Sequence, residues 1–122
     1  MVQRFSWRAR LRSFGHAFSG VATLLHEQHN SRLHLLAAII VISLGVLLEL
    51  SRGDWIALVL AIGLVWLAEA LNSALEYLCD AVTPEQHPLI KKSKDVAAAG
   101  VLLAALLAVV VGLLVFLPYL NV

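Results

Sequence analysis

The sequence predicts an all-α membrane protein, with an N-terminal amphipathic surface helix followed by three transmembrane helices. Of the 122 residues, 61% are hydrophobic and 14% are charged, and a soluble domain of this length could not bury so much apolar surface. The apolar residues form three runs, at about 33–50, 54–78 and 96–120. Each run approaches the ~20 residues with which a helix crosses ~30 Å of hydrocarbon. We therefore expect a single integral-membrane domain over residues 1–122.

Residues 1–30 precede the first run, and their pattern is that of an amphipathic helix. Apolar side chains recur at three- and four-residue steps, whereas Arg8 and Arg12 fall on the other side of the expected helix. The apolar positions are Trp7, Leu11, Phe14, Phe18, Val21 and Leu25. Such a helix lies in the cytoplasmic membrane interface or folds back onto the bundle, and the two arrangements are compatible.

The distribution of Lys and Arg predicts how the chain crosses the membrane. Five arginines precede or begin the first run, and three lysines lie in "AVTPEQHPLIKKSK" between the second and third runs, where Pro84 and Pro88 interrupt any continuous helix. The turn "SRGD" carries only Arg52. The positive-inside rule therefore places the N-terminus and the proline-containing loop in the cytoplasm, with the C-terminus outside.

Several other classes of protein lack support in the sequence. No basic patch is interleaved with aromatic residues in the way that RNA or DNA binding would need, so we expect no nucleic-acid partner. No glycine-rich phosphate loop occurs, which excludes the usual soluble nucleotide-binding folds. Cys79 is the single cysteine, so the chain cannot form an internal disulfide.

The stretch "EALNSALEYLCD" at 69–80 carries polar residues at the end of the second apolar run. Glu69, Asn72, Glu76 and Asp80 would lie within an arc of about 80° on one helix face. A charged side chain at the centre of a bilayer costs at least ~2.5–3.5 kcal/mol. A single polar residue in a membrane helix often serves only to hydrogen-bond to a neighbouring helix, but that role does not explain four aligned polar residues well. We therefore expect this face to be a functional site.

Two carboxylates on one helix face can divide their roles, one as a general base and the other as a ligand for a hard cation. Lys94 and Asp95 stand at the cytoplasmic start of the third run, where Lys suits a phosphate and Asp suits a ribose, an adenine amine or a metal-bound water. Lys91 and Lys92 are interpreted as a solvated flank. A proton-coupled channel or transporter subunit would also use intramembrane carboxylates, but it would not need Lys94 and Asp95.

The segment "EALNSALEYLCDAVTPEQHPLIKKSKDVAAAGVLLAAL" resembles the prokaryotic diacylglycerol kinase and undecaprenol kinase family, and "NSRLHLLAA" and "SFGHAFSG" resemble its N-terminal motifs. The resemblance implies a small homotrimeric lipid kinase of the bacterial inner (cytoplasmic) membrane, with a cytoplasmic active site. It would use ATP with Mg²⁺ to phosphorylate the hydroxyl of a membrane lipid. "RLHLLAA" and "HPLIKKSKDVAAAGVLL" resemble the undecaprenol branch more than the diacylglycerol branch. We therefore expect undecaprenol as the substrate, with diacylglycerol as the alternative.

The resemblance also implies roles for individual residues. Glu69 corresponds to the catalytic base that meets the lipid hydroxyl, and Glu76 to a ligand of the ATP-bound magnesium. The expected ATP-binding residues are His16, Gln28, Glu76, Glu85, Gln86, His87, Lys94 and Asp95, with Asn72 and Asp80 in the active-site shell. Gln28 stands where the family often has a second magnesium-binding Glu. The gap would be filled by the Gln28 amide oxygen, by Glu27 or by water.

Overall fold

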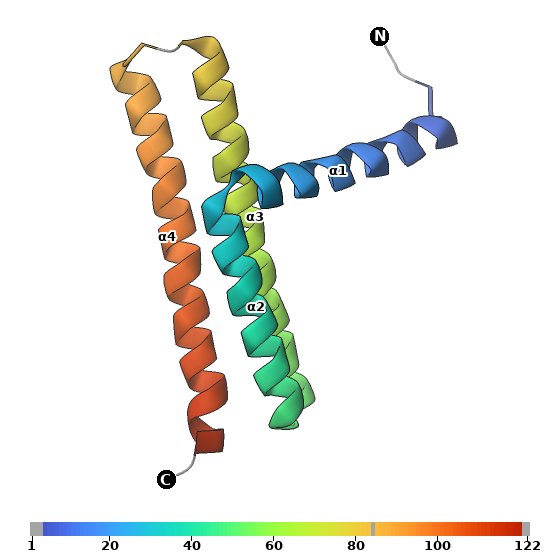
Figure 1. Cartoon of the computed structure of the whole chain (residues 1–122), viewed down its shortest axis with the longest axis vertical. Coiled ribbons are helices and arrows are strands. Elements are labelled where there is room, and N and C mark those ends of the chain that lie inside the picture. The colour runs from blue at the N-terminus through green and yellow to red at the C-terminus, as the bar shows by residue number, and fades with distance from the viewer. Residues whose placement is uncertain (1–3, 84, 121–122) are drawn as a thin grey trace.

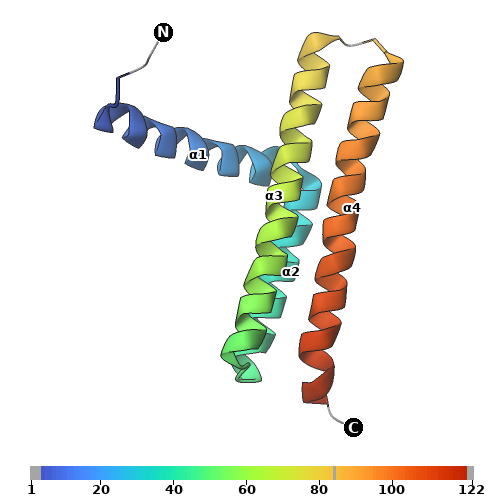
Figure 2. The ribbon, with the colours of Figure 1, turned by 180° about the vertical axis from the view of Figure 1, so that it is seen from behind.

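The computed structural model describes residues 4–83 and 85–120, and every element in these ranges is helical. The elements are α1 (Trp7–Glu27), α2 (His29–Leu47), α3 (Arg52–Val82), α4 (Pro88–Phe116) and the short 3₁₀ helix η1 (Leu117–Leu120). Helices α2, α3 and α4 run alongside one another as an elongated bundle, and α1 projects sideways from it (Figures 1 and 2). The predicted all-α class is confirmed.

Three helical segments are long and apolar enough to cross a membrane: His29–Leu47, Arg52–Val82, and α4 continued by η1 to Leu120. Helix α3 has 31 residues, which at 1.5 Å per residue corresponds to roughly 46 Å and exceeds the ~30 Å of a hydrocarbon core. The ends of α3 and α4 that meet at their connecting loop accordingly extend beyond the level at which α1 leaves the bundle (Figure 1). The charged end of α3 therefore has room outside the hydrocarbon.

Helices α3 and α4 begin at capping residues, ahead of the apolar runs predicted for them. Helix α2 begins earlier than its run and ends at Leu47, before the run ends near residue 50. Ser51 caps α3, since its Oγ accepts a hydrogen bond from the Asp54 amide at 3.2 Å. His87 caps α4 through its Nδ1, which accepts from the Leu89 amide at 3.1 Å, and Pro88 occupies the first helical turn. The lysines after Pro88 therefore lie on helical turns of α4 and not in a loop.

Arg32 holds the corner between α1 and α2. Its Nε donates to the Leu25 carbonyl at 2.8 Å, and its Nη2 donates to the His26 carbonyl. These carbonyls belong to the last turn of α1, where backbone acceptors lack helical partners and the helix dipole favours a cation. The arginine thus fixes the direction in which α1 leaves the bundle.

A small apolar core lies at the opposite end of the bundle, around Leu50, Leu58 and Val115. Here Gly45 is required for space, because a Cβ at this position would lie 2.7 Å from Cη2 of Trp55. Tyr119 closes this end by donating to Asp54 Oδ2 at 2.8 Å. Most other large apolar side chains of the described residues are exposed. Such a surface is expected where lipid or a neighbouring subunit, and not water, surrounds the helices.

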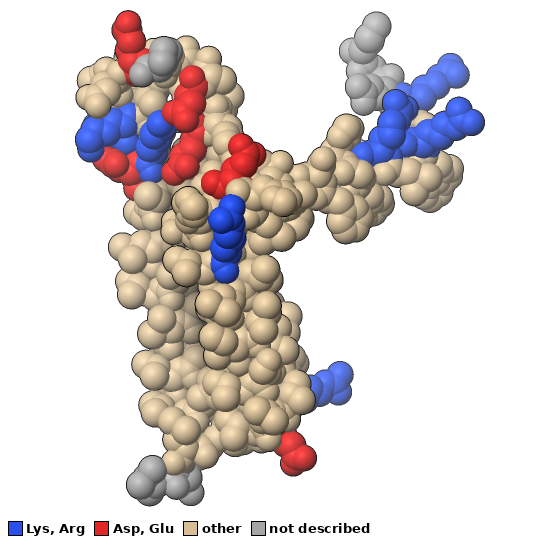
Figure 3. Space-filling view, viewed as in Figure 1, with Lys and Arg blue, Asp and Glu red and all other residues tan. Residues whose placement is uncertain are grey.

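Charged side chains lie mainly at the two extremities. Figure 3 shows them gathered around the α3–α4 loop and at the outer end of α1, with a few more where α1 joins the bundle and at the opposite end of the bundle, and with an uncharged surface along the bundle between these last two places. This charge distribution places the polar chemistry of the molecule at the loop end of α3 and α4.

Candidate active site

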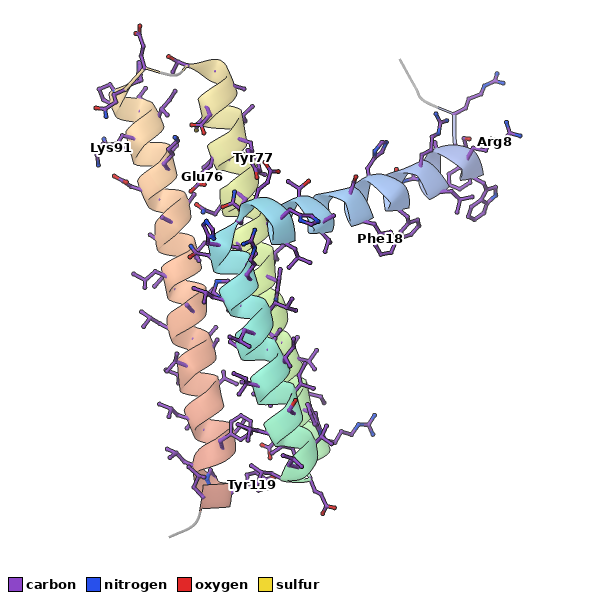
Figure 4. The ribbon with its side chains drawn as sticks, in the orientation of Figure 1. Arg8, Phe18, Glu76, Tyr77, Lys91 and Tyr119 are labelled. Carbon is purple, nitrogen blue, oxygen red and sulfur yellow. The ribbon has the colours of Figure 1, made fainter. Side chains whose placement is uncertain are left out.

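The polar face expected on α3 forms a gradient from buried to exposed. Glu69 is only 1% exposed and Asn72 is buried, Glu76 is half-buried, and Asp80 is exposed near the loop. Asn72 Nδ2 donates to Glu76 Oε1 at 3.2 Å, so two neighbouring members of the face are linked. Glu76 lies on the side of α3 that faces α4 (Figure 4). One helix face therefore connects a deeply buried carboxylate with the exposed loop end.

Two ion pairs bring cations to this end of the bundle. Lys94 Nζ lies 2.7 Å from Asp80 Oδ1 and joins α4 to α3, while Lys91 Nζ lies 2.7 Å from Asp95 Oδ2 within α4. All four side chains are substantially exposed, and ion pairs in contact with water are weak. An incoming anion can therefore displace Asp80 from Lys94 at little cost.

A cavity of about 510 Å³ lies among these groups, and we call it the loop cavity. Its described lining is Asp80, Thr83, Glu85, Gln86, His87, Pro88, Ile90, Lys91, Lys94 and Asp95. It thus gathers Glu85, Gln86 and His87 of the loop together with Asp80, Lys94 and Asp95, all of which the sequence assigned to the site. Its volume falls in the range typical of small-molecule sites.

Three residues expected to bind ATP do not line the loop cavity: His16, Gln28 and Glu76, the last of which lies one turn before Asp80 on α3. His16 is exposed on α1 and does not line the loop cavity. Gln28 is the residue between α1 and α2, and its side-chain Nε2 donates to the Tyr77 hydroxyl at 3.1 Å. Tyr77 follows Glu76 directly on α3 but points about 100° away from it round the helix, so this bond joins Gln28 to α3 beside the polar face and not to Glu76. Among the described residues, no hydrogen bond joins Gln28 to Glu76 itself.

The oxygen atoms near Glu76 fit a magnesium ion that arrives with phosphates. Magnesium prefers oxygen ligands, keeps several waters, and commonly needs only one or two carboxylates in addition to substrate phosphates. Glu76 supplies a carboxylate, and Asn72 Oδ1 is buried without a hydrogen-bond partner among the described residues. Within the same residues no group of three His, Cys, Asp or Glu side chains is arranged to hold a metal. The donor set therefore suits an ion shared with a ligand.

Sequence reasoning assigned no role to three polar residues, one of which contacts the buried Glu69 and two of which are buried themselves. His34 Nε2 on α2 lies 3.4 Å from Glu69 Oε2, although the pair lacks the alignment of a hydrogen bond. Ser31 and Ser73 are fully buried, and their hydroxyls have no partner among the described residues. The available signal was the spacing of Ser31 and His34, which puts them one turn apart on a helix face.

A second cavity of about 330 Å³, which we call the apolar groove, runs between α2, α3 and α4 and reaches His34. The rest of its lining is apolar or aromatic: Ala37, Ala38, Val41, Leu58, Ala61, Ile62, Val65, Trp66, Ala105, Ala108, Val109, Gly112 and Phe116. Because His34 also contacts Glu69, the groove ends beside the buried carboxylate. The site thus has a polar side at the loop cavity and an apolar side within the bundle.

Comparison with known proteins gives a consistent similarity. Residues 15–116 match the family described as prokaryotic diacylglycerol kinase. The chain is 39% identical over 107 residues to an undecaprenol kinase of Bacillus subtilis, covering 88% of this chain and 87% of that protein. It is 41% identical over 107 residues to a diacylglycerol kinase of Synechocystis sp., covering 87% of this chain and 61% of that protein. A diacylglycerol kinase of Pseudomonas aeruginosa is 31% identical over 90 residues, covering 74% and 73% of the two chains.

Proposed function

This chain belongs to the prokaryotic diacylglycerol kinase family, and we propose that it transfers the γ-phosphate of ATP to the hydroxyl of undecaprenol, giving undecaprenyl phosphate. The observation that carries the proposal is the α3 face, which leads from the loop cavity past Glu76 to the buried Glu69. The similarity to an undecaprenol kinase over most of both chains supports this lipid. Diacylglycerol, giving phosphatidic acid, is the second candidate, and the names of two other relatives support it.

The loop cavity is the proposed nucleotide site. Lys94 would exchange Asp80 for phosphate oxygens, because a nucleotide offers it several anionic acceptors. Asp95 and the loop residues Glu85, Gln86 and His87 would contact the ribose and base. His16 would join the site only by a movement of α1 or as part of another subunit's site.

Glu76 is the proposed protein ligand for the magnesium that accompanies ATP, with Asn72 beside it and the amide oxygen of Gln28, Glu27 or a water completing the shell. The bound ion would neutralise negative charge on the β- and γ-phosphates. Glu76 lies between the loop cavity and Glu69 along the helix, and in this proposal the transferring phosphoryl group would lie there.

Glu69 is the proposed catalytic base. Its carboxylate would accept the proton of the lipid hydroxyl as that oxygen forms a bond to the γ-phosphorus and the bond to the ADP oxygen breaks. Burial of Glu69 within the bundle restricts access by soluble alcohols. A lipid alcohol held at the membrane surface could bring its hydroxyl to this depth, so the position selects for a membrane substrate.

We place the loop cavity and the N-terminus on the cytoplasmic side of a bacterial inner membrane, with the α2–α3 turn and the C-terminus outside. The charge distribution supports this orientation, because the lysines and most arginines lie towards the loop end and on α1. The loop cavity would then face the compartment that supplies ATP.

Helix α1 would lie in the cytoplasmic membrane interface. None of its residues is buried, and Phe18 is 73% exposed. Phe18 points to the side of α1 along which α2 descends, whereas Arg8 lies at the outer end of the helix (Figure 4). This arrangement would put the aromatic ring in lipid and the arginines near headgroups.

We further propose that the active form is a homotrimer, as the family resemblance implies. The large apolar side chains exposed along α2, α3 and α4 exceed what a soluble surface carries, and neighbouring subunits as well as lipid could cover them. A neighbour could also complete the metal shell that one chain leaves open.

The proposal is tested by measuring transfer of labelled γ-phosphate in lipid–detergent micelles that contain undecaprenol, diacylglycerol or no lipid alcohol. We expect labelled undecaprenyl phosphate at a higher kcat/KM than labelled phosphatidic acid, and no transfer without a lipid alcohol. A higher kcat/KM for diacylglycerol would make diacylglycerol, and not undecaprenol, the assigned substrate. Absence of label in both lipids would overturn the kinase assignment.

A further inference from the structure

We propose that His34 is a positioning residue for Glu69, whose Oε2 accepts a hydrogen bond from the His34 Nε2–H so that Oε1 faces the lipid hydroxyl. The inference rests on the proposed function, because it assigns a role within the same reaction. It adds a residue within α2 to a site whose base, main metal ligand and nucleotide cavity are proposed on α3, α4 and their loop.

The contacts of Glu69 carry the argument. The side chain is almost completely buried, and its Oε2 has no hydrogen-bond partner among the described residues. Asn72, one turn away, donates to Glu76 and not to Glu69. The polar contact that the structure does record for Oε2 is His34 Nε2, at 3.4 Å. A buried carboxylate oxygen without a donor is costly, and a small rotation of the imidazole would supply one.

The chemistry of histidine suits this role. A neutral imidazole carries one N–H donor, and the nitrogen that carries it is selected by the hydrogen bond it makes. The present separation is a few tenths of an ångström longer than a typical hydrogen bond. Contacts of catalytic groups often shorten and align only when substrate is bound, so closure of the His34–Glu69 pair would accompany lipid binding.

The position of His34 explains how lipid binding would be coupled to the base. Its side chain is 23% exposed and forms the polar end of the apolar groove. An apolar chain lying in the groove along Ala37, Ala105 and Ala108 would bring its polar end to His34 and Glu69 together. If the His34 N–H holds Oε2 of Glu69, the other oxygen, Oε1, would face the polar end of the bound lipid. Orientation matters because a misplacement of about 1 Å can cost about 10²-fold in rate.

A double-mutant cycle tests the inference on the full-length detergent-solubilised protein. The variants are His34→Leu, Glu69→Gln and the double variant, with His34→Gln as the conservative change and His26→Leu as the matched control. His26 is exposed at the end of α1, and it contributes only its backbone carbonyl to the Arg32 contact. For each protein, kcat and KM for the lipid, MgATP affinity and oligomeric state are measured.

We expect His34→Leu to lower kcat by about 10²-fold with near-normal MgATP affinity, and His26→Leu to leave all values unchanged. His34→Gln should recover at least tenfold relative to His34→Leu, since its amide also donates an N–H. In the Glu69→Gln background, His34→Leu should lower the remaining rate by less than about threefold, because residues that act as a unit are not additive.

Additive losses in the two single variants would overturn the inference, as would equal losses in His34→Gln and His34→Leu. If His34→Leu does not assemble, His34→Met replaces it in the same cycle as a flexible side chain without an N–H donor. The inference and the proposed function fail in different ways. Absence of lipid phosphorylation by the unmodified protein contradicts the function, whereas an active protein with an additive cycle contradicts only the role of His34.

Discussion

The Lys94 ammonium on α4 lies 2.7 Å from the Asp80 carboxylate on α3, and this pair forms part of the wall of the loop cavity. The contact pairs the cation with a carboxylate and positions it between the two helices. A triphosphate would offer Lys94 more negative charge than Asp80 does. In the proposed function, Lys94 would exchange Asp80 for phosphate oxygens when ATP binds.

Replacing Lys94 with Met should weaken MgATP binding by roughly tenfold or more, because a hydrogen bond to a charged group is lost. Lys92→Met is the matched control, since Lys92 is exposed on the same helix but does not line the loop cavity. Equilibrium binding of MgATP to the solubilised protein provides the measurement. Equal affinities for the two variants would remove Lys94 from the nucleotide site.

Glu76→Gln should lower MgATP affinity and turnover together, because the variant keeps the size of the side chain but loses the charge that a hard cation needs. The Asn72 amide donates to Glu76, and a Gln oxygen can still accept that bond, so the local structure should persist. Glu49→Gln, at an exposed position at the other end of the bundle, is the control. Unchanged MgATP binding by Glu76→Gln would refute the assignment as a metal ligand.

Gln28→Glu should shift the magnesium dependence of turnover to lower concentrations, because it adds an anionic oxygen ligand. The new carboxylate can accept a hydrogen bond from the Tyr77 hydroxyl, which now accepts from the Gln28 amide. A magnesium titration of phosphoryl transfer checks the shift, with Glu27→Ala measured in parallel. If Gln28→Glu leaves the titration unchanged and Glu27→Ala weakens magnesium dependence, Glu27 holds the role instead.

Gly45→Ala should destabilise the bundle by about 1–3 kcal/mol, the usual cost of overpacking. The added Cβ would lie 2.7 Å from the Trp55 ring and 2.9 Å from the Leu50 side chain. Gly53→Ala is the control, because a Cβ at Gly53 meets no heavy atom within 4 Å. Thermal unfolding in detergent should show a lower midpoint for Gly45→Ala alone. Equal midpoints would mean that Trp55 moves aside without cost.

The polar face of α3 was predictable because helical periodicity alone fixes which residues share a face. Glu69, Asn72, Glu76 and Asp80 are separated by three or four positions, so any α-helix aligns them. The three apolar helices were predictable for a similar reason, since composition and length determine whether a helix can cross a membrane. Local pattern therefore sufficed for the class of fold and for the main polar face.

The contact of His34 with Glu69 was not predictable from local pattern. It depends on the register in which α2 packs against α3, and that register follows from the packing of many apolar side chains whose sequence periodicity carries little information. The first two turns or so of α4 were also not predicted, because their lysines interrupt the apolar run, although the His87 cap and Pro88 start a helix there. The His34–Glu69 contact thus depends on long-range packing and the start of α4 on capping, and hydropathy reports neither.

The most direct test of the account is the rate of γ-phosphate transfer to undecaprenol by Glu69→Gln at saturating MgATP. The amide keeps the size of the side chain but cannot accept the proton, and loss of a general base typically costs about 10²–10⁴-fold. We predict a loss in that range with near-normal MgATP affinity, because Glu69 is assigned to neither the metal nor the nucleotide. A variant that keeps more than about a tenth of the normal rate would contradict the assignment of Glu69 as the base.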